Sequence, residues 1–147
     1  MAQMMTQNVT PLADYLRTAA ARRFCWGAWA ERSHDCCTFA WDWVRERTGI
    51  DAMADLRGRY RTCDDALALL QAAGCATLAD AVRIGAARAG LDQTDDPRPG
   101  DVGLVEMHDG LMPGGILCIR MDHAWAAPGL RGIVETRAPA LISWRVP

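Results

Sequence analysis

Apolar positions in the first part of the chain recur at the spacing of an amphipathic helix. Beyond Thr10 they fall at Leu12, Tyr15, Leu16 and Ala19. Thr10 suits an N-cap and Pro11 suits the first helical position, so we expect a helix that ends near residue 21 or 22. The next segment, RRFCWGAWAERSHD, crowds three aromatic side chains around Gly27 and predicts an ordered loop with one apolar side.

A second helix is predicted for DCCTFAWDWVRERTGI. Its apolar stripe follows the i, i+3, i+4, i+7, i+8 pattern of a helix that packs on one face, and consists of Cys36, Phe39, Ala40, Trp43 and Val44. Asp35 is a suitable N-cap and Gly49 a suitable C′ residue. The pattern therefore places Cys36 in the first turn of the helix, on the side that faces the core.

The polar turn ADLRGRYRT separates this helix from a third, which we expect between a Thr62 cap and a Gly74 stop. For TLADAVRIGAARAG we expect a fourth short helix, with a strand at residues 81–84 as the alternative. The segment LDQTDDPRPGD is then predicted to be a turn-rich connector that ends the helical half.

After Asp101 the pattern changes to short apolar runs separated by Gly, Pro and Asp. These runs predict strands at residues 102–106, 115–120, 123–126, 132–135 and 142–146. Helices followed by consecutive strands indicate an α+β fold, with N-terminal helices packed on a C-terminal antiparallel, meandering sheet. We expect one domain over residues 1–147, with residues 1–9 as a flexible or partner-bound arm.

Composition narrows the classes of function. Sixteen basic and eighteen acidic residues are interspersed along the chain, giving a net charge of −2, so we expect neither nucleic-acid binding nor a membrane surface as a partner. All basic residues are arginine. We see no apolar segment of spanning length and no secretory signal, and we expect the six cysteines to be free thiols in a reducing cytosol.

Cys36 is the candidate nucleophile, because backbone N–H groups and the dipole at a helix start favour a thiolate. A cysteine nucleophile also needs a base, and the chain contains three histidines: His34, His108 and His123. His123 begins or precedes a strand, so it is the best placed of the three to reach a helix terminus. The alternative for Cys36 is ordinary packing as a small apolar side chain.

Two alternatives involve the same residues. One is a metal site formed by His34, Cys36, Cys37 and a distant cysteine, and the other is a disulfide from Cys25 to Cys36 or Cys37. Adjacent cysteines are poor ligands for one zinc ion, and the sequence contains no C-x₂-C pair. We therefore expect neither a metal nor another cofactor.

The segment FCWGAWAERSHDCCTFAWDWV, with the later RPGDVGLVEMHDGLMPGGILCIR, resembles the NlpC/P60 superfamily of papain-like cysteine peptidases and amidases. More closely, HDCCTFAWDWVRERTGIDAMADLRGRYRT and the closing SWRVP are similar to a small phage-encoded family of unknown function found among tail genes. The resemblance implies roles for six positions: Cys36 as the nucleophile, Asp35 as the preceding acid, Trp26 and Gly27 as the wall of the site, and Gly100 with Asp101 as the start of the first sheet strand.

One departure from the superfamily pattern bears on activity. Where the resemblance implies a catalytic histidine, this chain reads GGILCIR and has a glycine, Gly114 or Gly115. Loss of the base removes most of the activity of such a site. We therefore expect a degenerate site in a virion tail-tip or tail-assembly protein, made in the host bacterial cytoplasm and then carried in the tail. The alternative is an active amidase or endopeptidase that cleaves peptidoglycan stem peptides, with Cys36, Asp35 and a substituting His123 or His108.

Tryptophan and arginine are frequent anchors of protein contacts. The candidates for contact with other tail-tip or baseplate proteins are Trp29, Trp125, Arg57, Arg59 and Arg61. The alternatives are plain packing for the two tryptophans and a solvated turn for the three arginines.

Overall fold

The computed structural model describes residues 11–106 and 115–147. The α-helices of this part are α1 (Leu12–Ala20), α2 (Thr38–Thr48), α3 (Cys63–Ala72) and α4 (Leu78–Arg88). All four were predicted. The N-cap of α1 is Pro11 and not Thr10, so the helix begins one residue later than predicted. Thr10 and the arm predicted at residues 1–9 lie outside the described residues.

Local capping chemistry accounts for the ends of these helices. Thr62 accepts a hydrogen bond from the Asp65 N–H, and Thr77 forms a capping box with Asp80 at the start of α4. Gly49 ends α2 with a φ of 77°, in the left-handed region that glycine adopts without steric cost. Residues 81–84 are helical, which decides between the two alternatives for that segment.

The main sheet consists of β3 (Asp92–Thr94), β4 (Val102–Val105), β5 (Ile116–Arg120), β6 (Trp125–Pro128), β7 (Ile133–Thr136) and β8 (Ala140–Arg145). The strand order is β3-β8-β4-β5-β6-β7, and every pair is antiparallel. The α+β class is therefore confirmed. The simple meander holds only from β4 to β7, because β8 returns to pair with β4, and β3 was not predicted at all.

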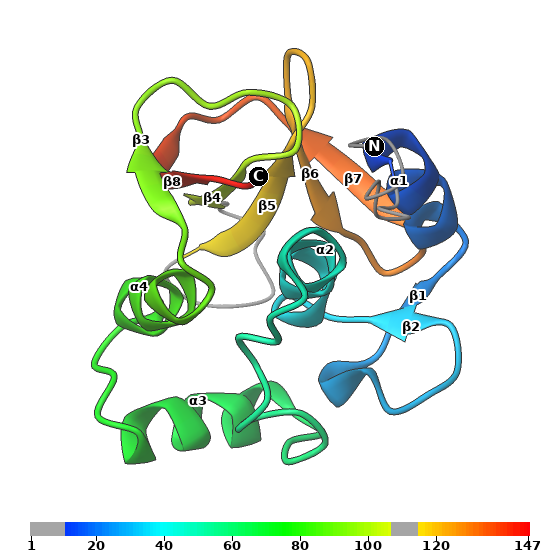
Figure 1. Ribbon diagram of the computed structural model, residues 1–147. Helices are drawn as coiled ribbons and strands as arrows, with labels where there is room; N and C mark the ends of the chain where they lie inside the picture. Colours follow the sequence, from blue (N-terminus) through cyan, green and yellow to red (C-terminus); the bar gives the residue numbers. More distant parts are fainter. Residues whose placement is uncertain (1–10, 107–114) are drawn as a thin grey trace, which may run out of the picture.

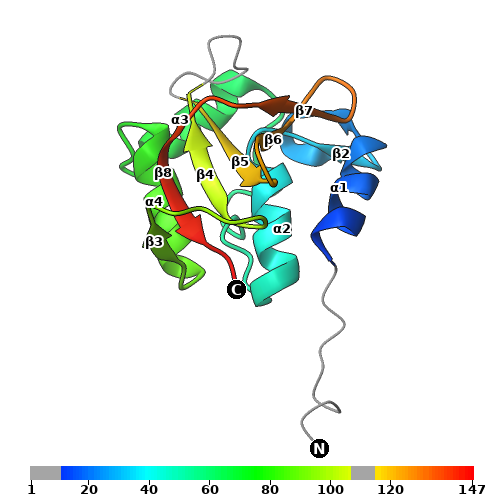
Figure 2. The ribbon, with the colours of Figure 1, turned by 90° about the horizontal axis from the view of Figure 1, so that it is seen from above.

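The return of β8 to β4 requires a curled sheet. Thr136 ends β7 and Ala140 begins β8, and four residues can span at most about 14 Å. Crossing a flat sheet from β7 to β8 would take four strand spacings, or about 19 Å. Figure 2 shows β7 continuing through this short link into β8. Curling brings Trp125 of β6 over Gly103 of β4, where an added Cβ would lie 2.5 Å from the indole ring.

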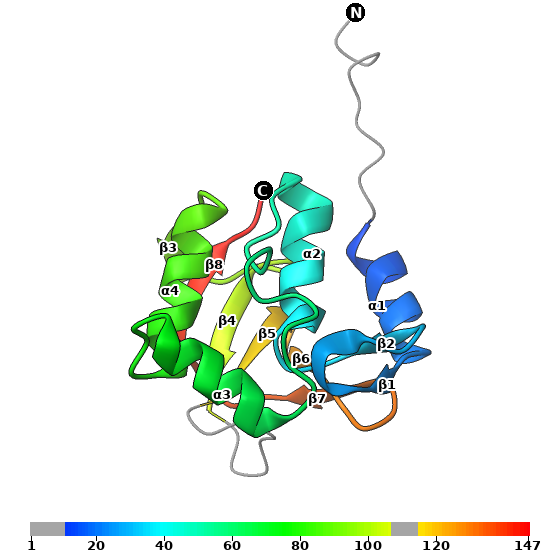
Figure 3. The same ribbon diagram turned by 90° about the horizontal axis from the view of Figure 1, so that it is seen from below.

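The helices pack around this sheet (Figure 1). Helix α2 packs against β5, and α1 packs against β7. Phe39, Ala40 and Val44 of α2 are fully buried, and burial of each large apolar side chain contributes about 1.5–3 kcal/mol. Helix α3 lies next to α4 (Figure 3).

The loop predicted before α2 is ordered and contains regular elements. Strands β1 (Arg23–Phe24) and β2 (Ser33–His34) form a short parallel pair, with the 3₁₀ helix η2 (Trp26–Ala28) between them. Neither strand was predicted, because two residues are too few to show an alternating pattern. The pair holds the loop beside the start of α2.

Gly100 and Asp101, expected to start the first sheet strand, directly precede β4, which follows β3 in the chain. Asp101 directly precedes β4 and is 1% exposed, and its carboxylate accepts hydrogen bonds from the Arg98 and Val146 N–H groups. The indole N–H of Trp43 donates to the Gly100 carbonyl at 2.8 Å. These bonds fasten the strand start to α2 and to the C-terminal segment.

Candidate functional site

Asp35, which was predicted as the N-cap of α2, caps the turn that leads into the helix, and the N-cap position itself is Cys37. One carboxylate oxygen, Oδ1, accepts hydrogen bonds from the backbone N–H groups of Cys37 at 2.8 Å and Thr38 at 2.7 Å. In return, the Asp35 N–H donates to the Thr38 hydroxyl, and the Asp35 carbonyl accepts from Phe39. Cys36 is therefore in the first turn of the helix, although regular helix geometry begins at Thr38.

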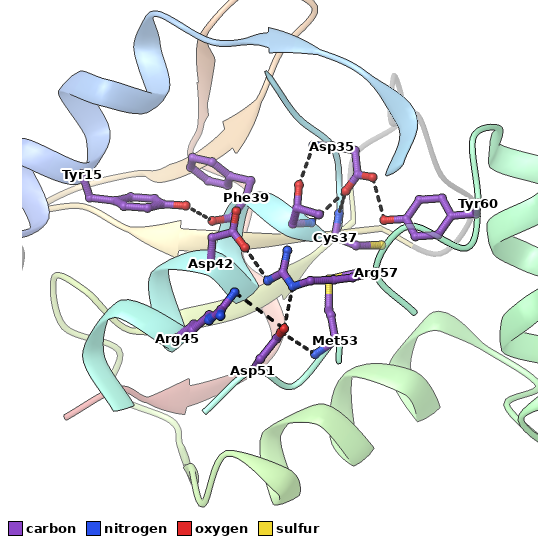
Figure 4. A network of polar contacts seen from close by, with 11 residues as sticks. Tyr15, Asp35, Cys37, Phe39, Asp42, Arg45, Asp51, Met53, Arg57 and Tyr60 are labelled. Carbon is purple, nitrogen blue, oxygen red and sulfur yellow. Dashed lines mark hydrogen bonds and ion pairs between the residues drawn. The ribbon is translucent and has the colours of Figure 1, made fainter. Parts of the chain in front are cut away.

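The other oxygen of the same carboxylate joins two further segments. Oδ2 accepts from the Gly27 N–H at 2.8 Å and from the Tyr60 hydroxyl at 2.6 Å. Gly27 has a φ of 84°, and a Cβ there would lie 2.1 Å from the Tyr60 carbonyl oxygen. Only glycine fits this close approach. The fully buried Asp35 therefore joins α2, the η2 loop and the segment before α3. Figure 4 shows its contacts with the start of α2 and with Tyr60.

The surroundings of Cys36 do not favour a reactive thiolate. The side chain is 2% exposed, and burial, followed by the negative charge of Asp35, raises the pKa of the thiol to about 12. The start of a helix favours a thiolate, but here desolvation and the neighbouring carboxylate outweigh it. Cys36 packs instead in an apolar cluster with Val105, Ile116 and Cys118.

Two of the three histidines are described, and neither shows the geometry of a base for Cys36. His34 lies in β2 and is fully buried, with its Nε2 at 3.0 Å from the Gly132 carbonyl. Burial lowers the pKa of His34 to about 4, so the ring is neutral and Nε2 carries the proton that it donates. His123 is exposed in the turn between β5 and β6. His108 lies outside the described residues. In the described ranges no hydrogen bond joins a histidine to Cys36.

Gly115, one of the two positions at which the superfamily would place its histidine, has no room for a side chain. Its φ of 113° is one that residues with a Cβ rarely adopt, and an added Cβ would lie 2.6 Å from the Val105 carbonyl oxygen. A histidine would therefore require this end of the β4–β5 pair to change shape. Gly114 lies outside the described residues.

Trp26 and Gly27 both lie in η2, beside Asp35. Trp26 is half-buried and makes an edge-to-face contact with Phe24, with ring centroids 5.1 Å apart. The resemblance gave these two residues the role of a wall. In this structure they cover the start of α2 together with Tyr60, whose pKa is raised by burial and by the charges of Cys37 and Asp35.

The residues predicted to bind partners divide into exposed and internal groups. Trp29 is 62% exposed, and the Arg61 guanidinium lies 5.3 Å from the centre of its ring. Arg59 is also exposed and donates to the Asp55 carbonyl. Trp125, by contrast, is 2% exposed, because the curled sheet folds it over Gly103, so its assignment as a contact residue is wrong.

Arg57 was also predicted to face a partner, but it is engaged within the chain. Its Nη2 pairs with Asp42 of α2, and its Nε donates to Asp51 at 2.7 Å. Arg45 lies 3.8 Å from the same Asp51 carboxylate (Figure 4). Burial raises the pKa of Asp42, although the Arg57 charge acts in the opposite direction. Sequence reasoning missed this network, because fifteen residues separate Asp42 from Arg57 and no local pattern links them.

Over the described ranges, no cluster of three or more His, Cys, Asp or Glu side chains has the arrangement needed to hold a metal ion. All six cysteines are described and none forms a disulfide. In the same ranges, no helix is both long and apolar enough to cross a bilayer.

Fold and site together define an α+β protein with a buried cysteine at a capped helix start. The sequence matches the family described as "Domain of unknown function (DUF6950)" over residues 4–146, and the chain belongs to this family. Comparison with curated proteins found no match, and comparison with solved structures found none either.

Proposed function

We propose that this chain is a non-catalytic structural protein, a tail-tip or tail-assembly component of a siphophage or prophage, with an NlpC/P60-like fold. The proposed lack of catalysis rests on the state of Cys36, because its thiol is buried and protonated at neutral pH. The NlpC/P60-like fold and the tail setting rest on the resemblance in sequence. On this proposal the protein is made in the host cytoplasm and then becomes part of the virion.

The contacts of Asp35 and Gly115 support a structural role for the residues that match the superfamily pattern. Asp35 uses both carboxylate oxygens to join three segments, and none of its four bonds orients a catalytic base. At Gly115 the close approach of the Val105 carbonyl fills the space that a histidine side chain would need. Both features stabilise the fold without requiring chemistry at Cys36.

The surface proposed to bind neighbouring tail proteins is the Trp29–Arg61 pair with Arg59. A large aromatic ring that is 62% exposed and covered on one face by a guanidinium is a typical contact anchor. Both side chains would bury apolar area on binding, and Arg61 could still pair with an acidic group of the partner. Peptidoglycan is a partner only under the alternative, in which the chain is an amidase or endopeptidase.

The cysteine is tested first, by labelling the folded protein with iodoacetamide near pH 7.5 and mapping the modified peptides. Cys25 and Cys63 are half-buried, and we expect both to react before Cys36 and Cys118, whose pKa values burial raises to about 12. Labelling of Cys36 ahead of the half-buried thiols would support the alternative, a cysteine amidase.

The second test uses a phage or prophage that encodes the chain. Cys36→Ala is expected to leave infectivity and cell-wall digestion unchanged, whereas loss of cell-wall digestion would overturn the proposal. The double variant Trp29→Ala with Arg61→Ala is expected to reduce incorporation into tails by about tenfold, the size typical of a contact anchor. Leu141→Ala is the matched control, since Leu141 is 59% exposed and lies on β8, which is on the other side of the sheet from β1 and β2 (Figure 1).

A further inference from the structure

A cavity of about 620 Å³ lies on the side of the molecule where α1 ends and the η2–β2 loop begins. Its wall combines the end of α1, the loop at residues 28–33, and two side chains from α2 and the following turn, Asp42 and Arg57. A volume of this size falls within the range of small-molecule sites. The cavity is separate from Cys36, which does not line it.

The charge of this cavity is positive. Arg22, Arg32 and Arg57 line it, against the single carboxylate of Asp42. Asp42 is already paired with Arg57, and the ion pairs of the described residues include neither Arg22 nor Arg32. The Nη1 of Arg22 is buried without a hydrogen-bond acceptor among the described residues, although its guanidinium also lies over the Tyr15 ring. Asp42 also attracts the Arg22 charge, so one carboxylate faces three guanidinium groups in this concave site.

The backbone of the cavity wall is held in an unusual shape. Ala28 and Arg32 are the non-glycine residues with positive φ in the described ranges, at 50° and 54°, and both line this cavity. Such conformations are strained for residues with a Cβ and are concentrated at functional sites. Here the loop is held by the Ala28 N–H bonded to the Cys25 carbonyl at 2.8 Å and by the Ser33 hydroxyl bonded to the Ala30 carbonyl.

From this geometry we propose that the cavity binds an oxyanion, the carboxylate or phosphate group of a small molecule, with Arg22 and Arg32 as its principal partners. Guanidinium groups present paired N–H donors that match the geometry of such groups, and hydrogen bonds between ionised partners are the strong ones. Thr18 lines the same wall, and its hydroxyl can add a neutral donor. This inference does not depend on the proposed role in a phage tail.

The experiment is a titration of the ¹⁵N-labelled protein, followed through its amide resonances, with inorganic phosphate in one arm and acetate in the other. Chloride keeps the ionic strength constant in both arms, because exposed charges respond to salt alone. We expect saturable shifts centred on residues 28–33. Saturation by phosphate alone assigns a phosphate site, by acetate alone a carboxylate site, and by both a general oxyanion site. Shifts that do not saturate, or that map elsewhere, overturn the proposal.

Matched variants separate a built site from general attraction to a positive surface. Arg32 is exposed, so Arg32→Gln is expected to fold and to bind about tenfold to a hundredfold more weakly, the size of one lost bond to a charged group. Arg32→Lys keeps the charge but loses the paired donors, and should bind with intermediate affinity. Arg83→Gln is the control, because Arg83 is exposed on α4, on the opposite side of the molecule from α1 (Figure 1). Equal weakening in the Arg32 and Arg83 variants would overturn the proposal.

Discussion

Replacing Asp35 by asparagine is the sharpest test of how this fold is held together. The side-chain amide has nearly the same shape, but it has one acceptor oxygen where the carboxylate has two. The acceptor would remain with the Cys37 and Thr38 N–H groups, because turning the amide would leave both of these donors unpaired. The amide NH₂ would then face Gly27 and Tyr60. The tyrosine hydroxyl can rotate and accept, but the Gly27 N–H can only donate and would be left buried and unpaired.

The expected loss in the free energy of unfolding follows from these hydrogen bonds. A buried donor without a partner costs about 1–3 kcal/mol, and the bonds that remain lose the extra strength that an ionised acceptor provides. We therefore expect Asp35→Asn to lower the free energy of unfolding by about 2–4 kcal/mol, a large fraction of the ~5–15 kcal/mol typical of a domain. Tyr60→Phe removes a single donor from the same carboxylate and should cost about 2 kcal/mol.

The measurement is urea unfolding followed by tryptophan fluorescence, with the free energy extrapolated to zero denaturant. Asp64→Asn is the control, because Asp64 is exposed in the first turn of α3 and its loss should cost at most about 1 kcal/mol. The combined Asp35→Asn and Tyr60→Phe variant should lose less than the sum of the single losses, since both act on one network. A loss below about 1 kcal/mol for Asp35→Asn would refute the reasoning.

Two further predictions concern pH and backbone shape. Burial holds the pKa of His34 at about 4, against 6.5 in the unfolded chain, so only the unfolded chain binds this proton between those values. The free energy of unfolding should therefore fall by about 3 kcal/mol as the pH drops from 6.5 to 4, with no loss from this group above pH 7. His34→Gln should flatten that slope in denaturation measured across the pH range, and an unchanged slope would contradict the assignment. Gly115→Ala should cost about 3 kcal/mol or more and Gly58→Ala only about 1–2, since both have positive φ but only Gly115 faces a carbonyl. Equal losses in thermal or urea unfolding would show that the close contact at Gly115 does not matter.

Local sequence patterns predict much of the candidate site. The Asp35 cap, the first-turn position of Cys36 and the glycine stop of α2 follow from backbone groups that must be satisfied within a few residues. The state of the thiol could not be found in the same way. The helix start argues for a thiolate, and only the packing of Val105, Ile116 and Cys118 around the sulfur reverses that argument.

Sequence analysis missed contacts between residues that are distant in the chain. Arg57 looked like a surface residue in a polar turn, yet it pairs with Asp42 and Asp51. Trp125 looked like a contact anchor, yet the curl of the sheet buries it. Strand β3 consists of the polar residues Asp92–Thr94, and only its pairing with β8 makes it a strand.

The sequence by itself determined the four helices, the Thr62 cap and the Gly49 stop, the strands β4 to β8 within a few residues, the α+β class, and the absence of a histidine at positions 114 and 115. These features depend on periodicity and on hydrogen bonds made within one turn of the chain. Tertiary structure alone decided the strand order, the protonated state of Cys36, the two further donors to Asp35 and the arginine-lined cavity. Each of these depends on which distant segments meet, and so on burial and charge, which a local pattern does not record.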